Sequence, residues 1–403
     1  MIAPGLCLAK IEVMISRRFF VASCVGAALT QASETRDVVL LKVPDGGLQP
    51  QAVVDSSDVI HLIYLYGDPA AADIGYVRKA PGDRQFSEPI RVNDQPGSAI
   101  AVGTVRGAHL AIGRLDRIHV AWNGSAKAGP KAARNSAPML YTRMRDDGQG
   151  FEKQRNVMQV TTGLDGGGTV AADQFGNVYV AWHAQGQKDG EPQEGEIHRR
   201  VWIAGSTDDG RTFATERPIS PETNGACGCC GMGALADREG NAYLLYRTAR
   251  ELVHRDMYLL VSRDRGKTFE AIELQPWKIG GCPMSTASLS EANGRVVVSW
   301  ETEKQVYFAP VDDRGLAGNP IAAPGQSSNR KHPAVAIDDA GRILLAWTEG
   351  TGWKKGGTSE WCIFKDGIPQ LPAGNRQASL PVPAWGLVTA VAIKNQFFVI
   401  GTA

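Results

Sequence analysis

The sequence predicts an all-β fold, a β-propeller of four-stranded blades, with seven blades favoured and six as the alternative. Three observations predict it. A turn residue followed by an apolar run that ends in an aromatic residue recurs along the chain every 47 to 64 residues or so. Short alternating segments flank each copy, and no long amphipathic helix stands out. Four-stranded units at this period are typical of propellers, in which ring closure removes the exposed sheet edges.

Six copies of this repeat are complete. Each is predicted to form a hairpin, in which a short strand, a turn containing Asp or Gly, and the apolar run follow one another. Two further short strands complete each unit, and the strands favour Val, Ile, Tyr and Trp. The copies are DSSDVIHLIYLY (55–66), RLDRIHVAW (114–122), DQFGNVYVAW (173–182), DREGNAYLLY (237–246), EANGRVVVSW (291–300) and DDAGRILLAW (338–347).

A seventh, weaker copy, IKNQFFVIG (393–401), lies near the C-terminal end. Residues 387–402 supply two strands, and DVVLLKV (37–43) can add a third strand to the same blade. A blade assembled from both ends of the chain would close the ring. We therefore expect a single propeller domain over residues 37–403.

The segment before this domain, residues 1–32, is predicted to be an export signal, with Met14 as an alternative start. Arg17 and Arg18 precede a short apolar run, 19–29, and a small-residue cleavage site follows. The run is too short for a membrane span. The letters SRRFF resemble the twin-arginine signal of proteins that are exported already folded. We therefore expect an exported protein, periplasmic or secreted, without a membrane span.

Charge and composition exclude one class of partner. The chain has 43 Lys and Arg against 42 Asp and Glu, which leaves a net charge of +1, and no basic stripe stands out. Nucleic-acid binding needs such a positive surface, so we expect no nucleic-acid partner. A protein partner stays open, because no segment identifies one.

A second motif, Ser-x-Asp-x-Gly-x-Thr-Phe, falls in the turn between the third and fourth strands. It is complete at 206–213 and 262–269, and degraded copies stand at 144–151 and 311–318. This motif is the Asp-box, and through it the chain resembles the sialidase (neuraminidase) superfamily of BNR-repeat propellers. We expect a structural role, in which the Asp accepts backbone N–H groups, the Gly allows positive φ and the Phe packs. The residues concerned are Asp208, Gly210, Phe213, Asp264, Gly266 and Phe269.

The resemblance also implies a catalytic set that this sequence lacks. Sialidases bind the substrate carboxylate with three arginines, the first in an Arg-Ile-Pro motif, and use a tyrosine nucleophile late in the propeller. Here the matching region reads LLKVPDG (40–46), and no tyrosine follows Tyr307. Lysine is a poor substitute for the bidentate arginine fork, and one arginine able to face the channel, Arg330, makes no triad. We expect no conventional exo-sialidase activity, and the catalytic residues of any other reaction are unknown.

Three cysteines within four positions mark the segment NGACGCCGMGALAD (224–237). An alignment of the repeats on their turn residues places these cysteines just ahead of the innermost strand of a blade. Another cysteine, a histidine and an aspartate hold similar positions in other blades. Innermost strands begin at one mouth of the central channel, so these side chains should gather there. The residues are Cys227, Cys229, Cys230, Cys282, His332 and Asp165.

This group of residues predicts a soft-metal site at the channel mouth. Thiolates are soft ligands that suit copper(I) or zinc, and copper fits an exported protein best, with zinc as the alternative. The predicted ligands are Cys227, Cys229, Cys230, Cys282 and His332, with Asp165, Met232 and Met284 as additional candidates.

Other interpretations stay open. Cys282 could form a disulfide with one of the three clustered cysteines and join two blades, or the thiols could have a redox role. The protein could instead be a glycoside hydrolase or lyase that acts on acidic glycans. A third possibility is a non-catalytic module that binds a glycan or a protein.

Two loops carry further candidates for these alternatives. Trp353 and Trp361 lie in a predicted exposed loop and are candidate sugar platforms. His183 and His198 bracket an acidic segment, 187–196, that we expect to be a solvated insertion at the rim.

Overall fold

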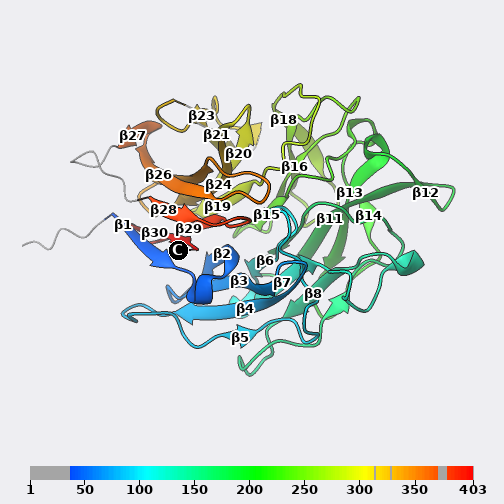
Figure 1. Cartoon of the computed structure of the whole chain (residues 1–403), viewed down its shortest axis with the longest axis horizontal. Coiled ribbons are helices and arrows are strands. Elements are labelled where there is room, and N and C mark those ends of the chain that lie inside the picture. The colour runs from blue at the N-terminus through cyan, green and yellow to red at the C-terminus, as the bar shows by residue number, and fades with distance from the viewer. Residues whose placement is uncertain (1–36, 313–314, 327–328, 371–378, 403) are drawn as a thin grey trace, which may run out of the picture. The chain divides into compact units, whose positions relative to one another are not determined.

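Seven sheets make up the described part of the chain, and each sheet is one blade of a propeller (Figure 1). The structure, a computed structural model, describes residues 37–312, 315–326, 329–370 and 379–402, which belong to one unit, Asp37–Ala403. The predicted export signal, residues 1–32, lies outside the described residues. Among the described residues, no helix is both long and apolar enough to cross a membrane.

Each of the first six blades has four strands in the order of the chain, from the channel outward. Blades 1 to 3 consist of β2 (Leu48–Val54), β3 (Ile60–Asp68), β4 (Ala71–Lys79), β5 (Ile90–Arg91), then β6 (His109–Ile112), β7 (Ile118–Asn123), β8 (Met139–Arg143), β9 (Arg155–Asn156), then β10 (Gly168–Ala172), β11 (Val178–Lys188), β13 (Arg199–Ser206) and β14 (Arg217–Pro218), with β12 (Glu191–Gln193) paired to β11.

Blades 4 to 6 consist of β15 (Gly233–Ala236), β16 (Ala242–Arg247), β17 (Met257–Ser262), β18 (Glu270–Gln275), then β19 (Ser288–Ala292), β20 (Arg295–Thr302), β21 (Gln305–Asp312), β22 (Gly315–Leu316), then β24 (Arg330–Ile337), β25 (Ile343–Glu349), β26 (Gly357–Lys365) and β27 (Ile368–Gln370), with β23 (Ile321–Ala322) paired to β21 and β28 (Leu380–Val382) to β26. Short 3-10 turns lie at Pro44–Gly46, Arg114–Asp116, Ala133–Asn135, Glu196–His198 and Glu222–Asn224.

The seventh blade joins the two ends of the domain. It contains β29 (Val388–Ile393), β30 (Gln396–Gly401) and, from the other end of the chain, β1 (Val38–Lys42). β1 pairs with β30 in parallel, with Val38 opposite Phe397 and Lys42 opposite Gly401. The inner strands contact one another in sequence, and β29 contacts β2, so the ring is closed. The prediction of seven blades is confirmed, and the alternative of six is not.

The apolar runs fill the space between blades. Seven buried clusters, one for each pair of adjacent blades, pack each blade against the next. The aromatics that end the runs are among the largest fully buried side chains, as Trp122, Trp182 and Trp300 show. A propeller blade buries both of its faces in this way, which explains why the repeats are apolar almost throughout.

Asp side chains shape the turns at the end of the ring opposite the cysteine loop. In the hairpin turn between β10 and β11, Asp173 Oδ1 accepts hydrogen bonds from the N–H groups of Phe175 and Asn177, both at 2.9 Å. In the Asp-box turns, Asp208 Oδ1 accepts the N–H of Thr212 at 2.8 Å, and Asp264 Oδ1 accepts the N–H of Thr268 at 2.9 Å. These carboxylates accept backbone N–H groups within the turn, so the Asp residues have a structural role in the blades.

The other Asp-box residues also have structural roles. Gly210 and Gly266 have φ values of +74° and +77°, a region that glycine enters without strain. The Phe213 ring meets Tyr141 of the preceding blade edge to face, with the centroids 4.8 Å apart. Phe269 packs against the buried cluster between blades 3 and 4. The two complete Asp-box turns therefore also bind blades 3 and 4 to the blades that precede them.

Candidate metal centre

The cysteine loop lies between the outer strand of blade 3, β14, and the inner strand of blade 4, β15. Three blades hold its backbone. The N–H of Cys227 donates to the carbonyl of Arg247 on β16 at 2.8 Å, and the N–H of Gly231 donates to the carbonyl of Ser285, ahead of blade 5, at 2.8 Å. On the blade 3 side, Gly167 N–H lies 3.5 Å from the carbonyl of Cys230. The loop is thus fixed where three blades meet.

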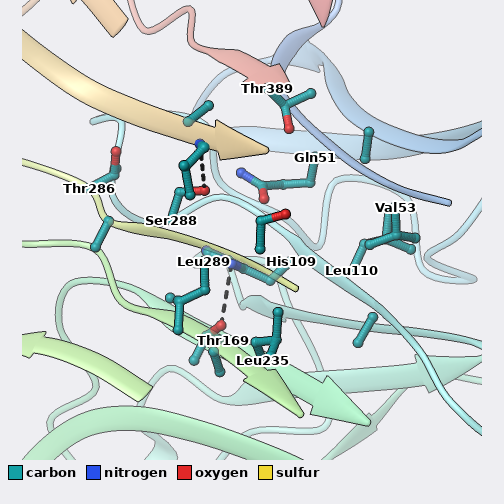
Figure 2. Close-up of a pocket in the computed structure, with 18 of the residues that line it drawn as sticks. Gln51, Val53, His109, Leu110, Thr169, Leu235, Thr286, Ser288, Leu289 and Thr389 are labelled. Atoms are coloured by element: carbon teal, nitrogen blue, oxygen red, sulfur yellow. Dashed lines mark hydrogen bonds between the residues drawn. The ribbon is translucent and has the colours of Figure 1, made fainter. Parts of the chain in front are cut away.

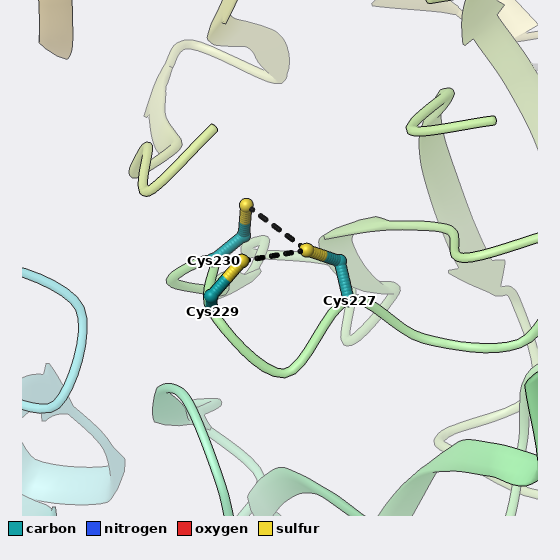
Figure 3. A group of neighbouring side chains, drawn as sticks. All are labelled: Cys227, Cys229 and Cys230. Atoms are coloured by element: carbon teal, nitrogen blue, oxygen red, sulfur yellow. Dashed lines mark hydrogen bonds between the residues drawn. The ribbon is translucent and has the colours of Figure 1, made fainter. Parts of the chain in front are cut away.

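The three thiols of this loop converge (Figure 3). Cys227 Sγ lies 3.2 Å from Cys229 Sγ and 3.5 Å from Cys230 Sγ, and the three sulfurs lie within 4.8 Å of one another. Cys227 and Cys230 are fully buried, and Cys229 is partly buried. All five cysteines of the described residues are free thiols. We refer to Cys227, Cys229 and Cys230 as the three-cysteine cluster.

Mutual hydrogen bonding separates the acidities of the three thiols. Burial alone would raise the pKa of Cys230, but hydrogen bonds from Cys227 and Cys229 and the charge of Arg247 hold it well below its usual value. The pKa of Cys229 is raised by its hydrogen bonds to Cys227 and Cys230 and by burial. The hydrogen bond with Cys229 lowers the pKa of Cys227. The hydrogen bond to Cys230 and burial have the larger combined effect, so the pKa of Cys227 lies well above its usual value. The cluster therefore holds one thiolate easily, at Cys230.

Buried arginines surround the cluster. Arg255 interacts electrostatically with Cys227 and Cys229, and its Nη2 donates to Glu196 Oε2 at 2.7 Å. The other two guanidinium nitrogens of Arg255 are buried without a hydrogen-bond partner. Arg247 donates to the carbonyls of Arg255 and Glu301, which fixes its guanidinium beside Cys230. Positive charge in this position stabilises thiolates, the form of cysteine that binds metals.

Asp165, an additional candidate ligand, lies beside the loop that carries the cluster but outside the converging group. Its Oδ1 accepts a hydrogen bond from Arg106 at 2.8 Å, and its Oδ2 lies 3.6 Å from Arg199. A Cβ on Gly228 would come within 2.8 Å of Asp165 Oδ2, so the carboxylate touches the loop backbone. Burial would raise the pKa of Asp165, but the two arginines hold it below its usual value. Asp165 is therefore a paired anion.

The remaining predicted ligands lie around the cluster. Cys282 is exposed and does not belong to the group of converging sulfurs, and it is a free thiol. Met232 is buried in the apolar cluster between blades 3 and 4, and Met284 is partly buried in the loop before β19. The disulfide between Cys282 and the other cysteines, which the sequence left open, does not occur among these thiols.

His332 lies inside β24, at a bulge in its pairing with β25, and has a φ of +52°. Such a backbone conformation is strained for a residue other than glycine. Its ring nitrogens lie 3.3 Å from the hydroxyls of Thr104 and Thr286. Burial lowers the pKa of His332 to about 3, so the ring is neutral at physiological pH. The ring lines the channel and already has two hydroxyl partners.

His183 precedes the acidic segment 187–196, which is predicted from the sequence to be a solvated insertion at the rim. It is fully buried on β11, and neither ring nitrogen has a hydrogen-bond partner. Burial and the charge of Arg199 lower its pKa to about 4, against the opposing effect of Cys230 and Asp165. The acidic segment itself forms the exposed hairpin of β11 and β12. The insertion therefore starts beyond His183.

A repeat position marks these buried polar residues. His183 directly follows the aromatic that ends its apolar run, Trp182, and Arg247 follows Tyr246 in the next blade. The same position is polar and buried in blades 2 to 6, at the cluster end of the second strands, and we refer to these five residues as the polar ring. Its members are Asn123, His183, Arg247, Glu301 and Thr348. An alignment that compared the residue after each aromatic would have found them.

The central channel opens beside the cluster. It is a cavity of about 400 Å³ lined by all seven inner strands, with Gly231, Thr286 and His332 at the end near the cysteine loop. Figure 2 shows its hydroxyl, amide and apolar side chains, and a hydrogen bond of 3.4 Å between His109 Nδ1 and Thr169 Oγ1. Arg330 does not line it. The Arg330 guanidinium instead stacks over Trp347 and bonds Glu349, so it holds blade 6 together.

Gly166 supports the cluster from blade 3, and its substitution gives a matched pair of variants. Gly166 and Gly46 both have φ of +67°, but a Cβ on Gly166 would lie 2.3 Å from the carbonyl oxygen of Gly228, whereas a Cβ on Gly46 meets nothing within 4 Å. Both variants, Gly166→Ala and Gly46→Ala, carry the same backbone strain of about 1–2 kcal/mol. We expect Gly166→Ala alone to displace the loop and lower metal affinity, as measured by competitive titration. Equal affinities would show that the loop does not depend on this contact.

Comparisons with known proteins support the fold. No protein-family model matches the chain, and no curated protein does. Among solved structures, a protein of unknown function from Dyadobacter fermentans is 15% identical and has a TM-score of 0.53. The match covers 78% of this chain and 93% of that protein. The NanB sialidase from Streptococcus pneumoniae is 10% identical and has a TM-score of 0.50. The match covers 76% of this chain and 65% of the sialidase chain. At these identities the likeness concerns the fold, which is a sialidase-like propeller.

Proposed function

We propose that this sialidase-like propeller is a metal-binding protein that holds one soft ion, copper(I) first and zinc as the alternative, in the three-cysteine cluster. One observation carries the proposal. Three free thiols of a single loop converge within 4.8 Å in a buried place where three blades meet. Cysteines that serve only packing have no reason to place three sulfurs together.

The spacing of the sulfurs fits an ion. A metal–sulfur bond of about 2.3 Å requires sulfurs roughly 3.8–4.0 Å apart in tetrahedral or trigonal geometry. The two pairs that involve Cys227 are 3.2 and 3.5 Å apart, and no sulfur lies more than 4.8 Å from another. Changes of less than about 1 Å in the three sulfur–sulfur distances, all within one loop, therefore create the site.

Charge and softness support copper(I). Metal binding requires thiolates, and Arg247 and Arg255 offset their negative charge inside the protein. Thiolates select copper(I) among the common ions, whereas structural zinc sites have four ligands. The converging group has only three members among the described residues.

The proposed place of action is outside the cytoplasm. This part rests on the sequence, in which Arg17, Arg18 and the apolar run after them form an export signal. A protein that is exported folded would carry its ion with it, which suits metal handling or the support of a redox step.

A second candidate function, glycan binding at the same mouth, has one observation in its favour. Trp353 is half exposed, and its ring edge lies beside Gly103 and near the Arg106 guanidinium, next to channel-lining Thr104. An exposed aromatic ring beside paired charged groups can stack on a sugar. Trp361, the other candidate, packs against a buried cluster. Glycan binding would survive the loss of the cysteines, and Trp353→Ala would abolish it.

Anaerobic titration with copper(I), against a chelator of known affinity, tests the primary proposal. The wild type is expected to bind one ion per chain, and Cys230→Ser is expected to weaken binding by at least 100-fold because it removes the most acidic sulfur. Cys362→Ser is the matched control, since Cys362 is buried and free but outside the cluster. Equal binding by the wild type and Cys230→Ser would refute the proposal, as would no binding at all.

A further inference from the structure

The polar ring contains one member without a hydrogen bond. Asn123 donates to the carbonyl of Gly166 and accepts from Gly168, and Thr348 donates to the carbonyl of Lys331. Arg247 donates to two carbonyls, and one carboxylate oxygen of Glu301 accepts the N–H of Lys304 at 3.0 Å. His183 alone among these five positions has no partner at either ring nitrogen. A fully buried polar group without a partner costs stability, so it calls for an explanation.

The strand directs His183 toward the cysteine loop. Alternate side chains of β11 face opposite sides, and Tyr179 and Ala181, which share the parity of His183, pack in the cluster between blades 3 and 4. His183 pairs with Val201 across the sheet, and Val201 belongs to the same cluster.

The same apolar cluster contains the residues that bracket the cysteine loop, Ala226 and Met232. His183 interacts electrostatically with Cys230, as His332 does from the channel. Its ring therefore lies in the interface on which the three-cysteine cluster rests.

We propose that His183 is the fourth donor when the three-cysteine cluster holds zinc, reached by a movement of its ring, which lies outside the group of converging sulfurs. The inference rests on the proposed function and adds a ligand that decides which ions the site accepts. Copper(I) is held by the three sulfurs alone. Zinc needs four donors, and three sulfurs with one imidazole make a common zinc site. His183 is better suited to this role than His332, because the ring of His332 already has two hydroxyl partners whereas that of His183 has none.

X-ray absorption spectra of the zinc-loaded protein test the assignment, together with zinc and copper(I) titrations. The wild type is expected to show three sulfurs and one imidazole around zinc. His183→Leu is expected to lose the imidazole scattering and to bind zinc about 10- to 100-fold more weakly, as removal even of groups behind metal ligands commonly does. Its copper(I) affinity is expected to stay within a few-fold. His332→Leu, the matched control, is expected to retain the zinc spectrum of the wild type.

The controls separate this inference from folding and from the proposed function. Leucine removes an unpartnered polar group from an apolar interface, so the metal-free variant is expected to unfold at or above the temperature of the wild type. His183→Gln, which keeps a polar side chain, should lose the imidazole signal as well. Imidazole scattering that persists in His183→Leu, or its absence from the wild type, would overturn the assignment. A wild type that binds neither ion would refute the proposed function itself.

Discussion

Copper(I) at a free concentration 1,000 times its dissociation constant is expected to raise the free energy of unfolding by about 4 kcal/mol. The reason is linkage: the folded chain holds three thiols within 4.8 Å of one another in one fixed arrangement, whereas the unfolded chain must order them before they can bind an ion. Residual binding to unfolded thiols would reduce the gain. Thermal unfolding followed by circular dichroism, with and without the ion under anaerobic conditions, measures it.

The same experiment on Cys230→Ser provides the control. This variant keeps the other four described cysteines but loses one sulfur of the folded site. A 100-fold loss of affinity leaves at most about 1.4 kcal/mol of the gain, so its unfolding temperature should rise far less with copper(I). An equal rise in both proteins would mean that the ion acts elsewhere, and a chelator that leaves the loaded wild type unchanged would contradict reversible binding.

Removal of residues 1–43 is expected to destabilise the propeller severely, whereas removal of residues 1–36 is expected to leave the unfolding of the domain unchanged. The longer deletion takes away β1, whose parallel pairing with β30 closes the ring. It also removes Val38 and Val43, which are buried in the clusters on the two sides of blade 7. Burial of two such side chains contributes about 3–6 kcal/mol, and a whole domain is stable by only about 5–15 kcal/mol.

Thermal unfolding and aggregation of the two truncated proteins, compared at one scan rate, check this prediction. Loss of β1 leaves an edge of β30 unpaired, and such edges promote association between chains. The longer deletion should therefore unfold at lower temperature and aggregate. Equal unfolding temperatures for the two proteins would show that the closing strand contributes little.

The fold was predictable from the sequence because each blade repeats one local pattern. The turn residue, the apolar run and the final aromatic recur, and the structure places hairpins at those positions, from Asp55 in blade 1 to Asp338 in blade 6. Even the closing strand at 37–43 was visible as an extra β segment at the opposite end of the chain. Most strand pairings lie within one repeat, and the pairing of β1 with β30 is the long-range contact that closes the ring.

The candidate site was predictable only in part. Three cysteines in four positions are conspicuous in the sequence, and their position ahead of an inner strand indicated one mouth of the ring. The burial of His183 and the placement of Arg247 and Arg255 depend on which face of a strand packs against the neighbouring blade, and on an insertion that begins beyond His183. The prediction for Cys282 was less successful. Its position ahead of β19 suggested that its thiol would join the three clustered cysteines, but the thiol is exposed and lies outside the cluster.

The most direct test of the metal site is the metal content and cysteine state of protein purified anaerobically without added metal. Elemental analysis is expected to find one ion of copper per chain. Alkylation of the unfolded, metal-free protein, mapped by mass spectrometry, should label Cys227, Cys229, Cys230, Cys282 and Cys362 as free thiols. A protein without any bound ion, in which Cys282 is joined by a disulfide to one of the three clustered cysteines, would contradict the account.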